Sequence, residues 1–352
     1  MPTLPAESLK GFVQTLFKAS GVAADEAMRV ASSLVDANLC GHDSHGVMRI
    51  PSYVDRVREG RIHPRGGLVV ERESASGIAC RGEWGFGQVV CRALVPRLVA
   101  MARATGAACG TLRETAHIGR LGEWAELACA EGCVALICAN THGSGQRVAP
   151  INGKRPRLGT NPLCVGFPGG AEGPFLLDFG TSATAEGKVR VKRIAGQSCP
   201  PGWLLDAEGR PTTDPNTLYG NPPGTILPMG GDQAYKGFGL AFLIELLCGA
   251  LSGGACAHPD PPPPLGNCAT FVVFDPARFT TQDALLREVR QLEQYVRGVP
   301  RIDPALPIVL PGDPERQTRM RRRAEGIPLD DGNWRALVDL AGVLNVRVPD
   351  VS

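Results

Sequence analysis

The sequence has few of the features that mark proteins which bind nucleic acids or membranes. Its 37 Lys and Arg residues nearly balance 35 Asp and Glu residues, and only 5% of its residues are aromatic. A net charge of +2 favours neither a nucleic-acid surface nor a polybasic membrane-binding face. No apolar run reaches the roughly 20 residues that a membrane span needs. Residues 1–20 lack a charged segment followed by an apolar core, so we expect no secretory signal and a cytoplasmic location.

Several signatures of metal and nucleotide sites are also missing. The chain has twelve cysteines but no Cys-x-x-Cys pair, and Cys129 and Cys133 have helical spacing. We expect the cysteines to be small, buried, reduced hydrophobic residues. His42 and His45 share a turn that offers no further ligand, so no metal site is expected. The dinucleotide fingerprint G-x-G-x-x-G is absent, which argues against a Rossmann domain.

Two glycine-rich segments fit neither the Rossmann spacing nor a P-loop. They are Trp84–Gly87 and Lys236–Gly239, and we interpret both as turns of close backbone approach at helix starts.

The length of 352 residues and the apolar share of 43% favour about two domains around a sizeable core. The first 60 residues predict three amphipathic helices, each with apolar residues three and four positions apart. Gly21, Gly41 and Gly60 follow these stripes as helix stops. The third stripe begins at Val47, which places Arg49 in the first turns of the third helix.

The middle of the chain predicts strands interspersed with helices, and therefore an α/β fold. The predicted strands are 69–70, 77–80, 107–112, 133–140, 163–167, 175–179 and 270–275. The predicted helices are 88–105, 121–131 and 235–251.

The end of the chain predicts helices again, at 285–297, 313–323 and 331–344, and we expect the two helical ends to pack together beside the middle. The proline-dense stretch 259–264 is interpreted as a rigid loop rather than a ligand for a partner domain. Arg319–Arg323 is interpreted as a solvated helix end.

One short stretch combines three side chains suited to chemistry on a carboxylate compound. Ser44, His45 and Arg49 fall at the turn between the second and third predicted helices. Histidine transfers protons near neutral pH. Arginine binds a carboxylate through two parallel hydrogen bonds. The stretch therefore predicts acid–base chemistry on a small molecule that carries a carboxylate.

Further candidates lie in the α/β middle, each with an alternative structural interpretation. His117 follows a predicted strand, where α/β proteins place catalytic loops, although it could equally be a hydrogen-bonded turn residue. The turn Leu158–Pro162 is rich in hydrogen-bond donors, although it could equally be a loop that only precedes a strand. Asp178 could accept from a sugar hydroxyl or cap a turn. Lys188 could hold an anion or be solvated.

Ordered segments along nearly the whole chain resemble the malate/L-lactate dehydrogenase family of the second, non-Rossmann type. They are 37–46, 117–120, 159–162, 178–182, 209–215 and 236–239. The resemblance implies a homodimer with a helical domain from both chain ends, residues 1–68 with 281–352. It also implies an α/β domain, residues 69–280, that binds NAD or NADP without the Rossmann fingerprint.

The resemblance also implies reversible hydride transfer between a 2-hydroxy acid and a 2-oxo acid. Arg49 matches the position that holds the substrate carboxylate, and Thr160 a substrate contact. Branches of the family differ in the proton donor: His45, with Ser44 beside it, in one, and His117 in another. Cofactor contacts are implied for His45, Gly119, Arg120, Leu121, Leu176, Leu177, Asp178, Phe179, Gly180, Tyr235, Asn267, Gly312, Asp313, Pro314 and Glu315.

One departure from the family pattern bears on the substrate. The branch that reduces cyclic imine-2-carboxylates carries an aspartate, partnered to its serine and histidine, where this chain has Lys188. A lysine cannot complete that relay. The hydroxyacid branch also carries lysine there, so we expect a 2-hydroxycarboxylate dehydrogenase, with cyclic imine reduction as the alternative.

Overall fold

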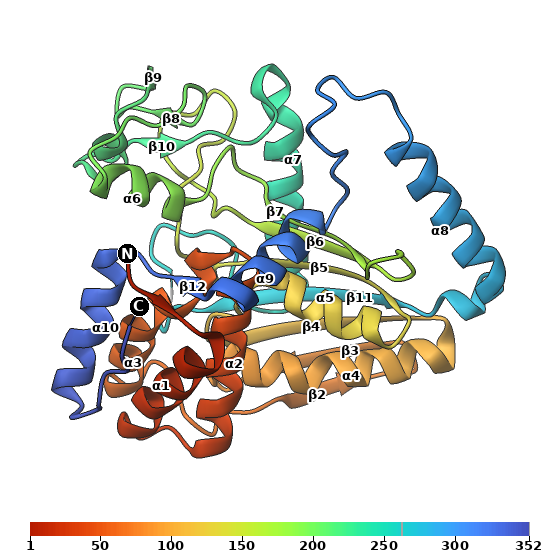
Figure 1. Cartoon of the computed structure of the whole chain (residues 1–352), viewed down its shortest axis with the longest axis horizontal. Coiled ribbons are helices and arrows are strands. Elements are labelled where there is room, and N and C mark those ends of the chain that lie inside the picture. Colours follow the sequence, from red (N-terminus) through yellow and green to blue (C-terminus); the bar gives the residue numbers. More distant parts are fainter. Residues whose placement is uncertain (262, 352) are drawn as a thin grey trace.

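A seven-stranded mixed sheet forms the middle of the protein in the computed structural model, which describes residues 1–261 and 263–351 (Figure 1). Only β3 and β4 are parallel neighbours, and the other pairs are antiparallel. The predicted α/β class is confirmed, and the topology differs from the parallel Rossmann sheet. The strands, in sheet order, are β2 (Val69–Glu73), β3 (Gly77–Arg81), β4 (Ala107–Thr115), β11 (Asn267–Phe274), β5 (Val134–Asn140), β6 (Pro162–Phe167) and β7 (Phe175–Gly180).

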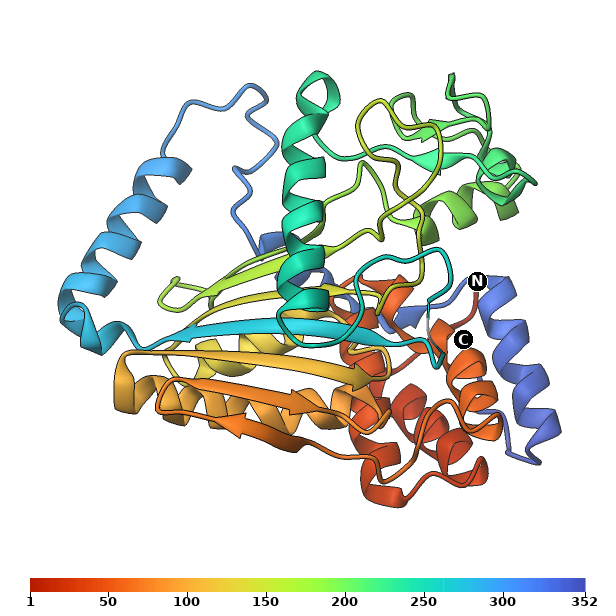
Figure 2. The same ribbon diagram turned by 180° about the vertical axis from the view of Figure 1, so that it is seen from behind.

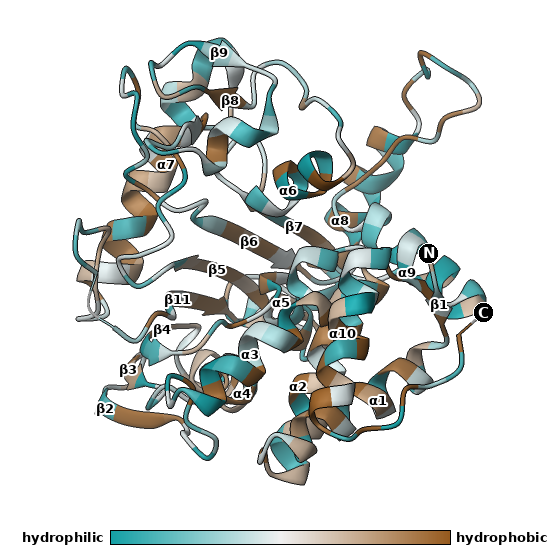
Figure 3. Cartoon of the chain, turned by 90° about the vertical axis from the view of Figure 1, so that its left-hand side faces the viewer, coloured by the Kyte–Doolittle hydropathy of each residue, from teal (hydrophilic) through white to brown (hydrophobic). Residues whose placement is uncertain are grey.

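Helices cover both faces of this sheet. One face carries α4 (Gly87–Thr105) and α5 (Leu121–Ala130). The other carries α7 (Ala234–Glu245), continued by the π-helical turn η5 (Leu246–Ala250) (Figure 2). The central strands are apolar on both faces, as their colour in Figure 3 shows, because both faces are buried. Leu98, Trp124 and Phe271 belong to the resulting core.

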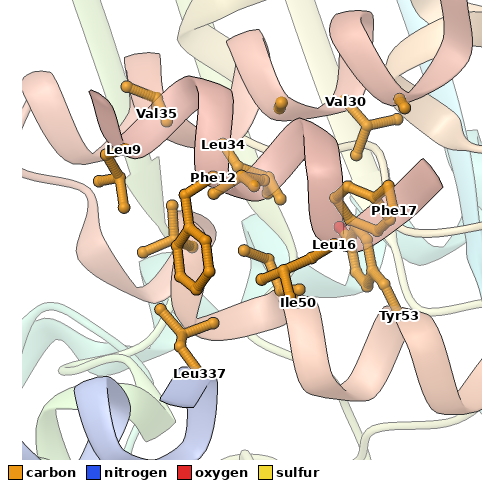
Figure 4. Packing of buried hydrophobic residues seen from close by; sticks show 14 of the residues in the cluster. Leu9, Phe12, Leu16, Phe17, Val30, Leu34, Val35, Ile50, Tyr53 and Leu337 are labelled. Atoms are coloured by element: carbon orange, nitrogen blue, oxygen red, sulfur yellow. The ribbon is translucent and has the colours of Figure 1, made fainter. Parts of the chain in front are cut away.

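The prediction that the two helical ends pack together is confirmed for the first three helices and the last one, and is wrong for the helix predicted at 285–297, which has no described residue in their cluster. A hydrophobic cluster joins α1 (Ala6–Ala19), α2 (Ala24–Leu39), α3 (Ile50–Arg58) and α10 (Asp331–Val343), and it includes Phe17, Ile50 and Leu337 (Figure 4). The short strand β1 (Thr3–Leu4) pairs with β12 (Ile327–Pro328) and ties the two ends to each other. Phe86 and Ala116 extend the cluster to the end of the sheet.

The division of the chain into domains at residues 68 and 281 stays a prediction. In the described residues, α8 (Gln282–Arg297) contributes nothing to the cluster of the chain ends and lies at the opposite side of the sheet (Figure 1). α9 (Asp313–Glu325) crosses between these regions beside α2.

Several small elements were not predicted. They are α6 (Glu186–Ile194), a three-stranded sheet of β10 (Thr225–Ile226), β8 (Leu204–Leu205) and β9 (Pro211–Thr212), and the 3-10 turns η3 (Pro215–Tyr219), η4 (Gly231–Gln233) and η6 (Pro276–Arg278).

The prediction that the third helix begins at Val47 is wrong. Two 3-10 turns, η1 (Asp43–His45) and η2 (Val47–Arg49), precede α3, and Gly46 between them has extended backbone with ψ of −154°. Arg49 is the residue that caps α3.

Other sequence predictions concern loops and cysteines. All twelve cysteines are free and ten of them are buried, as predicted. Gly85 and Gly237 are sites of close approach, since a Cβ there would lie 2.0 Å from Gly66 O and 2.3 Å from Met229 O. The described part of 259–264 is a loop, while Pro262 lies outside the described residues. Within the described chain, no helix is long and apolar enough to cross a membrane.

Candidate active site

Asn38, at the end of α2, holds the turn that carries Ser44, His45 and Arg49 through two side-chain hydrogen bonds. The Asn38 Oδ1 atom accepts the backbone N–H of Val47 at 2.8 Å, and its Nδ2 donates to Asp43 Oδ1 at 2.6 Å. A Cβ at position 46 would lie 2.2 Å from Asn38 Oδ1. Glycine at this position therefore lets the turn close over the Asn38 amide.

The same turn is held from the side by α9. Arg322 binds both carboxylate oxygens of Asp43, at 2.6 and 3.0 Å, and also donates to the carbonyl of Asn38. Arg319 pairs with Asp36 and Glu126. The interpretation of Arg319–Arg323 as a solvated helix end is therefore wrong for Arg319 and Arg322. Their carboxylate partners lie far away in the sequence.

The structure brings the two predicted proton donors together. The rings of His45 and His117 stack with centroids 5.4 Å apart and an interplanar angle of 21°. The Ser44 hydroxyl lies 3.0 Å from His45 Nδ1, and Arg49 Nε donates to the Ser44 carbonyl at 2.6 Å. His45 and His117 therefore belong to one site, with the Arg49 guanidinium beside them.

His117 reaches this position because its loop lies directly over the start of α4. A Cβ at Gly87 would lie 2.6 Å from His117 O, so only glycine allows this approach. Asn267 holds the loop from the other side, since its Oδ1 accepts the backbone N–H of Ile118 at 3.0 Å.

Two residues of the site were not predicted, Tyr53 and Gln88. The Tyr53 hydroxyl lies 2.7 Å from His117 Nδ1, and Gln88 Nε2 donates to the Tyr53 oxygen at 3.1 Å. Both side chains are buried. A sequence signal existed, because a tyrosine three positions after Ile50 lies on a buried helical stripe, where a hydroxyl needs a partner.

Burial and neighbouring charge keep both histidines neutral in the protein alone. Burial, followed by the Arg49 charge, lowers the pKa of His45 to about 3 and that of His117 well below its usual value. Burial also raises the pKa of the Tyr53 phenol. A carboxylate bound to Arg49 would offset the charge that disfavours protonated imidazole.

A second group of predicted residues gathers at the N-terminus of α5. The Asp178 carboxylate accepts the backbone N–H of Gly122 at 2.7 Å, and burial raises its pKa. Arg120 is buried and pairs with Asp36 at 2.9 Å and Glu126 at 2.5 Å. Asp178 therefore accepts from the first turn of α5, where a helix dipole favours an anion, rather than from the turn that follows it in the sequence.

A cavity of about 460 Å³ opens between the β6–β7 hairpin and the start of α9. Three residues predicted to contact the cofactor line it: Leu176, Gly312 and Glu315. Gly312 has φ of +91°, and a Cβ there would lie 3.2 Å from the backbone nitrogen of Leu176. A glycine at this position thus keeps the wall of the cavity open. Glu315 also pairs with His42 at 3.3 Å.

Six further predicted residues lie on or beside elements already described. Gly119 and Leu121 flank Arg120 beside the site, and Thr160 joins the end of β7 through its carbonyl, which accepts from Thr181. Phe179 and Gly180 lie on β7, and Pro314 lies in the first turn of α9.

Other predicted cofactor contacts lie apart or serve the fold. Asp313 is held by Arg297 and Arg316, whose hydrogen bonds outweigh burial and lower its pKa to about 2. Leu177 and Tyr235 are exposed. Among the described residues, no contact given by the structure links these two to the histidines. Lys188 is exposed on α6. In the same described set, no cluster of three or more His, Cys, Asp or Glu residues could hold a metal ion.

Comparison with known proteins identifies the family to which the chain is similar. The family model for malate/L-lactate dehydrogenase matches residues 4–338. Hydroxycarboxylate dehydrogenase B of Escherichia coli K12 is 38% identical over 340 residues, which cover 96% of this chain and 92% of that protein. A Δ1-pyrroline-2-carboxylate reductase of Ancylobacter novellus is 33% identical over 88% of this chain and 89% of that protein. The structure of sulfolactate dehydrogenase from Methanocaldococcus jannaschii has a TM-score of 0.86, at 29% identity over 98% of each chain.

Proposed function

Because the chain belongs to the malate/L-lactate dehydrogenase family, we propose that it is an NAD(P)-dependent 2-hydroxycarboxylate dehydrogenase. It would interconvert a 2-oxo acid and a 2-hydroxy acid. The observation that carries this proposal is the stacked pair of His45 and His117 beside Arg49. The three side chains offer a proton carrier and a carboxylate anchor within one site.

Arg49 is the group that would bind the substrate carboxylate. Its guanidinium is partly buried, and it faces Glu186 and Arg190 of α6 as well as the histidines. The Arg49 Nε donates to the Ser44 carbonyl, which leaves the terminal nitrogens for a bidentate contact. Thr160, half-buried in the loop just before β6, would contact the rest of the substrate.

The residues present fit a nicotinamide dinucleotide. The Asp178 carboxylate beside the start of α5 offers an acceptor for a ribose hydroxyl, and the cavity beside Gly312 offers open volume. When bound, the cofactor supplies the hydride. The proposed contacts are those implied by the family resemblance, and Leu177, Tyr235 and Pro314 among them are exposed.

Reduction of a cyclic imine-2-carboxylate is the second candidate, favoured by the similarity to a pyrroline-2-carboxylate reductase. The residue at position 188 argues against imine reduction. This residue is a lysine, exposed on α6, and it cannot supply the carboxylate that the relay of that branch requires.

We also propose that the protein is a cytoplasmic homodimer. Exposed apolar side chains cluster on α7 and η5, where Phe242, Leu243, Leu246 and Leu247 are all at least 41% exposed. A second copy of the chain would cover this surface. Twelve free cysteines suit a reducing compartment.

An assay of reduced-cofactor oxidation tests the function. NADH and NADPH are each offered with a panel of 2-oxo acids, including pyruvate and phenylpyruvate, and with pyrroline-2-carboxylate. We expect turnover of at least one 2-oxo acid that exceeds turnover of the imine. A greater rate with the imine would reverse the order of the two candidates, and no turnover in any combination would contradict both.

A further inference from the structure

Two buried side chains, Gln88 and Tyr53, form a hydrogen-bonded chain that ends at His117, and neither has a role in the proposed function. Gln88 of α4 is 1% exposed and Tyr53 of α3 is 2% exposed. The Gln88 amide donates to the Tyr53 oxygen, and the Tyr53 hydroxyl lies 2.7 Å from His117 Nδ1. Polar groups buried this deeply cost stability unless they are satisfied, so their retention calls for a reason.

A backbone donor indicates which tautomer neutral His117 adopts. The backbone N–H of Gly119 also points at Nδ1, at 3.4 Å. Since Gly119 and Tyr53 both donate to Nδ1, the ring proton lies on Nε2. In this arrangement Gln88 Oε1 is a buried acceptor without a partner in the described part of the chain.

We propose that Gln88 and Tyr53 form a reversible hydrogen-bond chain that serves both protonation states of Nδ1, which makes Tyr53 a positioning residue for proton transfer by His117. In the first state, Gln88 donates to Tyr53 and Tyr53 donates to Nδ1. In the second, Nδ1–H donates to the Tyr53 oxygen, and the Tyr53 hydroxyl donates to Gln88 Oε1. The switch turns the Gln88 amide by half a turn, so that its oxygen and nitrogen exchange places, and the Gly119 N–H gives up its long contact to Nδ1.

The second state is the one that both reaction directions require. In reduction, hydride adds to C2 of the oxo acid, the carbonyl electron pair moves to oxygen, and that oxygen takes the Nε2 proton of imidazolium. In oxidation, Nε2 accepts the hydroxyl proton, so the ring must already carry its other proton on Nδ1. The acceptor for Nδ1–H is Tyr53 in both cases, and water restores the proton on Nε2 between turnovers.

Charged groups around His117 make this acceptor necessary. Burial is the largest influence on the His117 pKa, and Arg49 from η2, His45 from η1 and, to a lesser extent, Arg56 from α3 also disfavour a positive imidazole. On the α6 side, Glu186 and Arg190 act on Arg49. Gln88 brings no charge from α4. The Tyr53 oxygen is therefore the contact that stabilises Nδ1–H within the protein.

The test rests on the proposed function and compares pH profiles of Tyr53→Phe and wild type in the reducing direction. Reduction needs protonated His117, so its kcat/KM falls as pH rises through the pKa of that group. Loss of the Tyr53 acceptor should move this fall to lower pH and reduce kcat about tenfold or more, with KM changed by less than about threefold. Gln88→Met should shift the profile the same way by a smaller amount.

Tyr295→Phe is the matched control, because it removes a tyrosine hydroxyl that is 83% exposed on α8. It should leave kcat and the profile unchanged. A Tyr53→Phe profile with the wild-type midpoint would overturn the hydrogen-bond chain, whatever the change in kcat. Wild-type protein without any turnover would instead overturn the proposed function, so the two failures are distinguishable.

Discussion

At the scale of single residues, the site joins side chains that the sequence shows and side chains that it hides. Ser44, His45 and Arg49 could be predicted because they share one short segment. Tyr53 and Gln88 could not be predicted, because their place in the site depends on contacts between α3, α4 and the loop after β4. Local reading of a sequence finds reactive residue types but not the partners that fold brings to them.

Arg49 carries the most direct prediction at this scale. Replacing it by Lys keeps the charge but removes the planar pair of donors that a carboxylate accepts. A charge-assisted pair is worth about 1.5–3 kcal/mol, so KM for the 2-oxo acid should rise about 10- to 100-fold. Steady-state kinetics would show this, and an unchanged KM would remove Arg49 from the carboxylate site.

The charge of Arg49 also predicts a pH effect. Burial and Arg49 lower the pKa of both histidines in the free enzyme, and a bound carboxylate offsets the Arg49 contribution. Reduction requires protonated imidazole and is lost as pH rises through the pKa. The midpoint for kcat, which reports the complex, should therefore lie at higher pH than the midpoint for kcat/KM, which reports the free enzyme. Coincident midpoints, or the opposite order, would contradict the coupling.

At the scale of elements, periodicity predicted most helices and strands and failed where it carries no signal. α6 is largely charged and buries only Val189, and the strands of the small sheet have two residues each. The 3-10 turns before α3 depend on the Asn38 side chain rather than on any repeat. The ion pairs of Arg319 and Arg322 could not be predicted from periodicity either, because their carboxylate partners come from α2, α5 and η1.

The turn between α2 and α3 supplies an element-scale prediction. Gly46→Ala forces Asn38 away from Val47 and Asp43, because the new Cβ would overlap its amide. We expect a loss of about 1–3 kcal/mol in the free energy of unfolding, measured with urea, together with a fall in activity.

The control is Gly11→Ala on the exposed side of α1, where a Cβ meets nothing within 4 Å. Alanine there should raise stability by about 0.5–1 kcal/mol and leave activity intact. Equal effects of the two substitutions would mean that the Asn38 contact does not hold the turn.

At the scale of the whole molecule, the family could be predicted from ordered segments, and the match over residues 4–338 confirms it. The position of α8, away from the other terminal helices, could not be predicted. Its amphipathic pattern predicts a helix but does not say against which element the helix packs.

The apolar surface of α7 and η5 predicts the assembly. Light scattering should give the mass of a dimer for the wild type, and Leu243→Glu with Leu247→Glu should shift it towards monomer, because two charges would be buried unpaired. Val343→Glu is the control, a change at a 66% exposed position on α10. A monomeric wild type, or a double variant that stays dimeric, would contradict this surface as the interface.

The account as a whole depends on hydride transfer to C2 of a 2-oxo acid. The most direct measurement supplies cofactor carrying deuterium at the transferable C4 position and examines the 2-hydroxy acid product by mass spectrometry. The account predicts a product heavier by the mass of one deuterium in place of hydrogen, with the label on C2. A product without the label, or no 2-hydroxy acid from any 2-oxo acid tested, would contradict it.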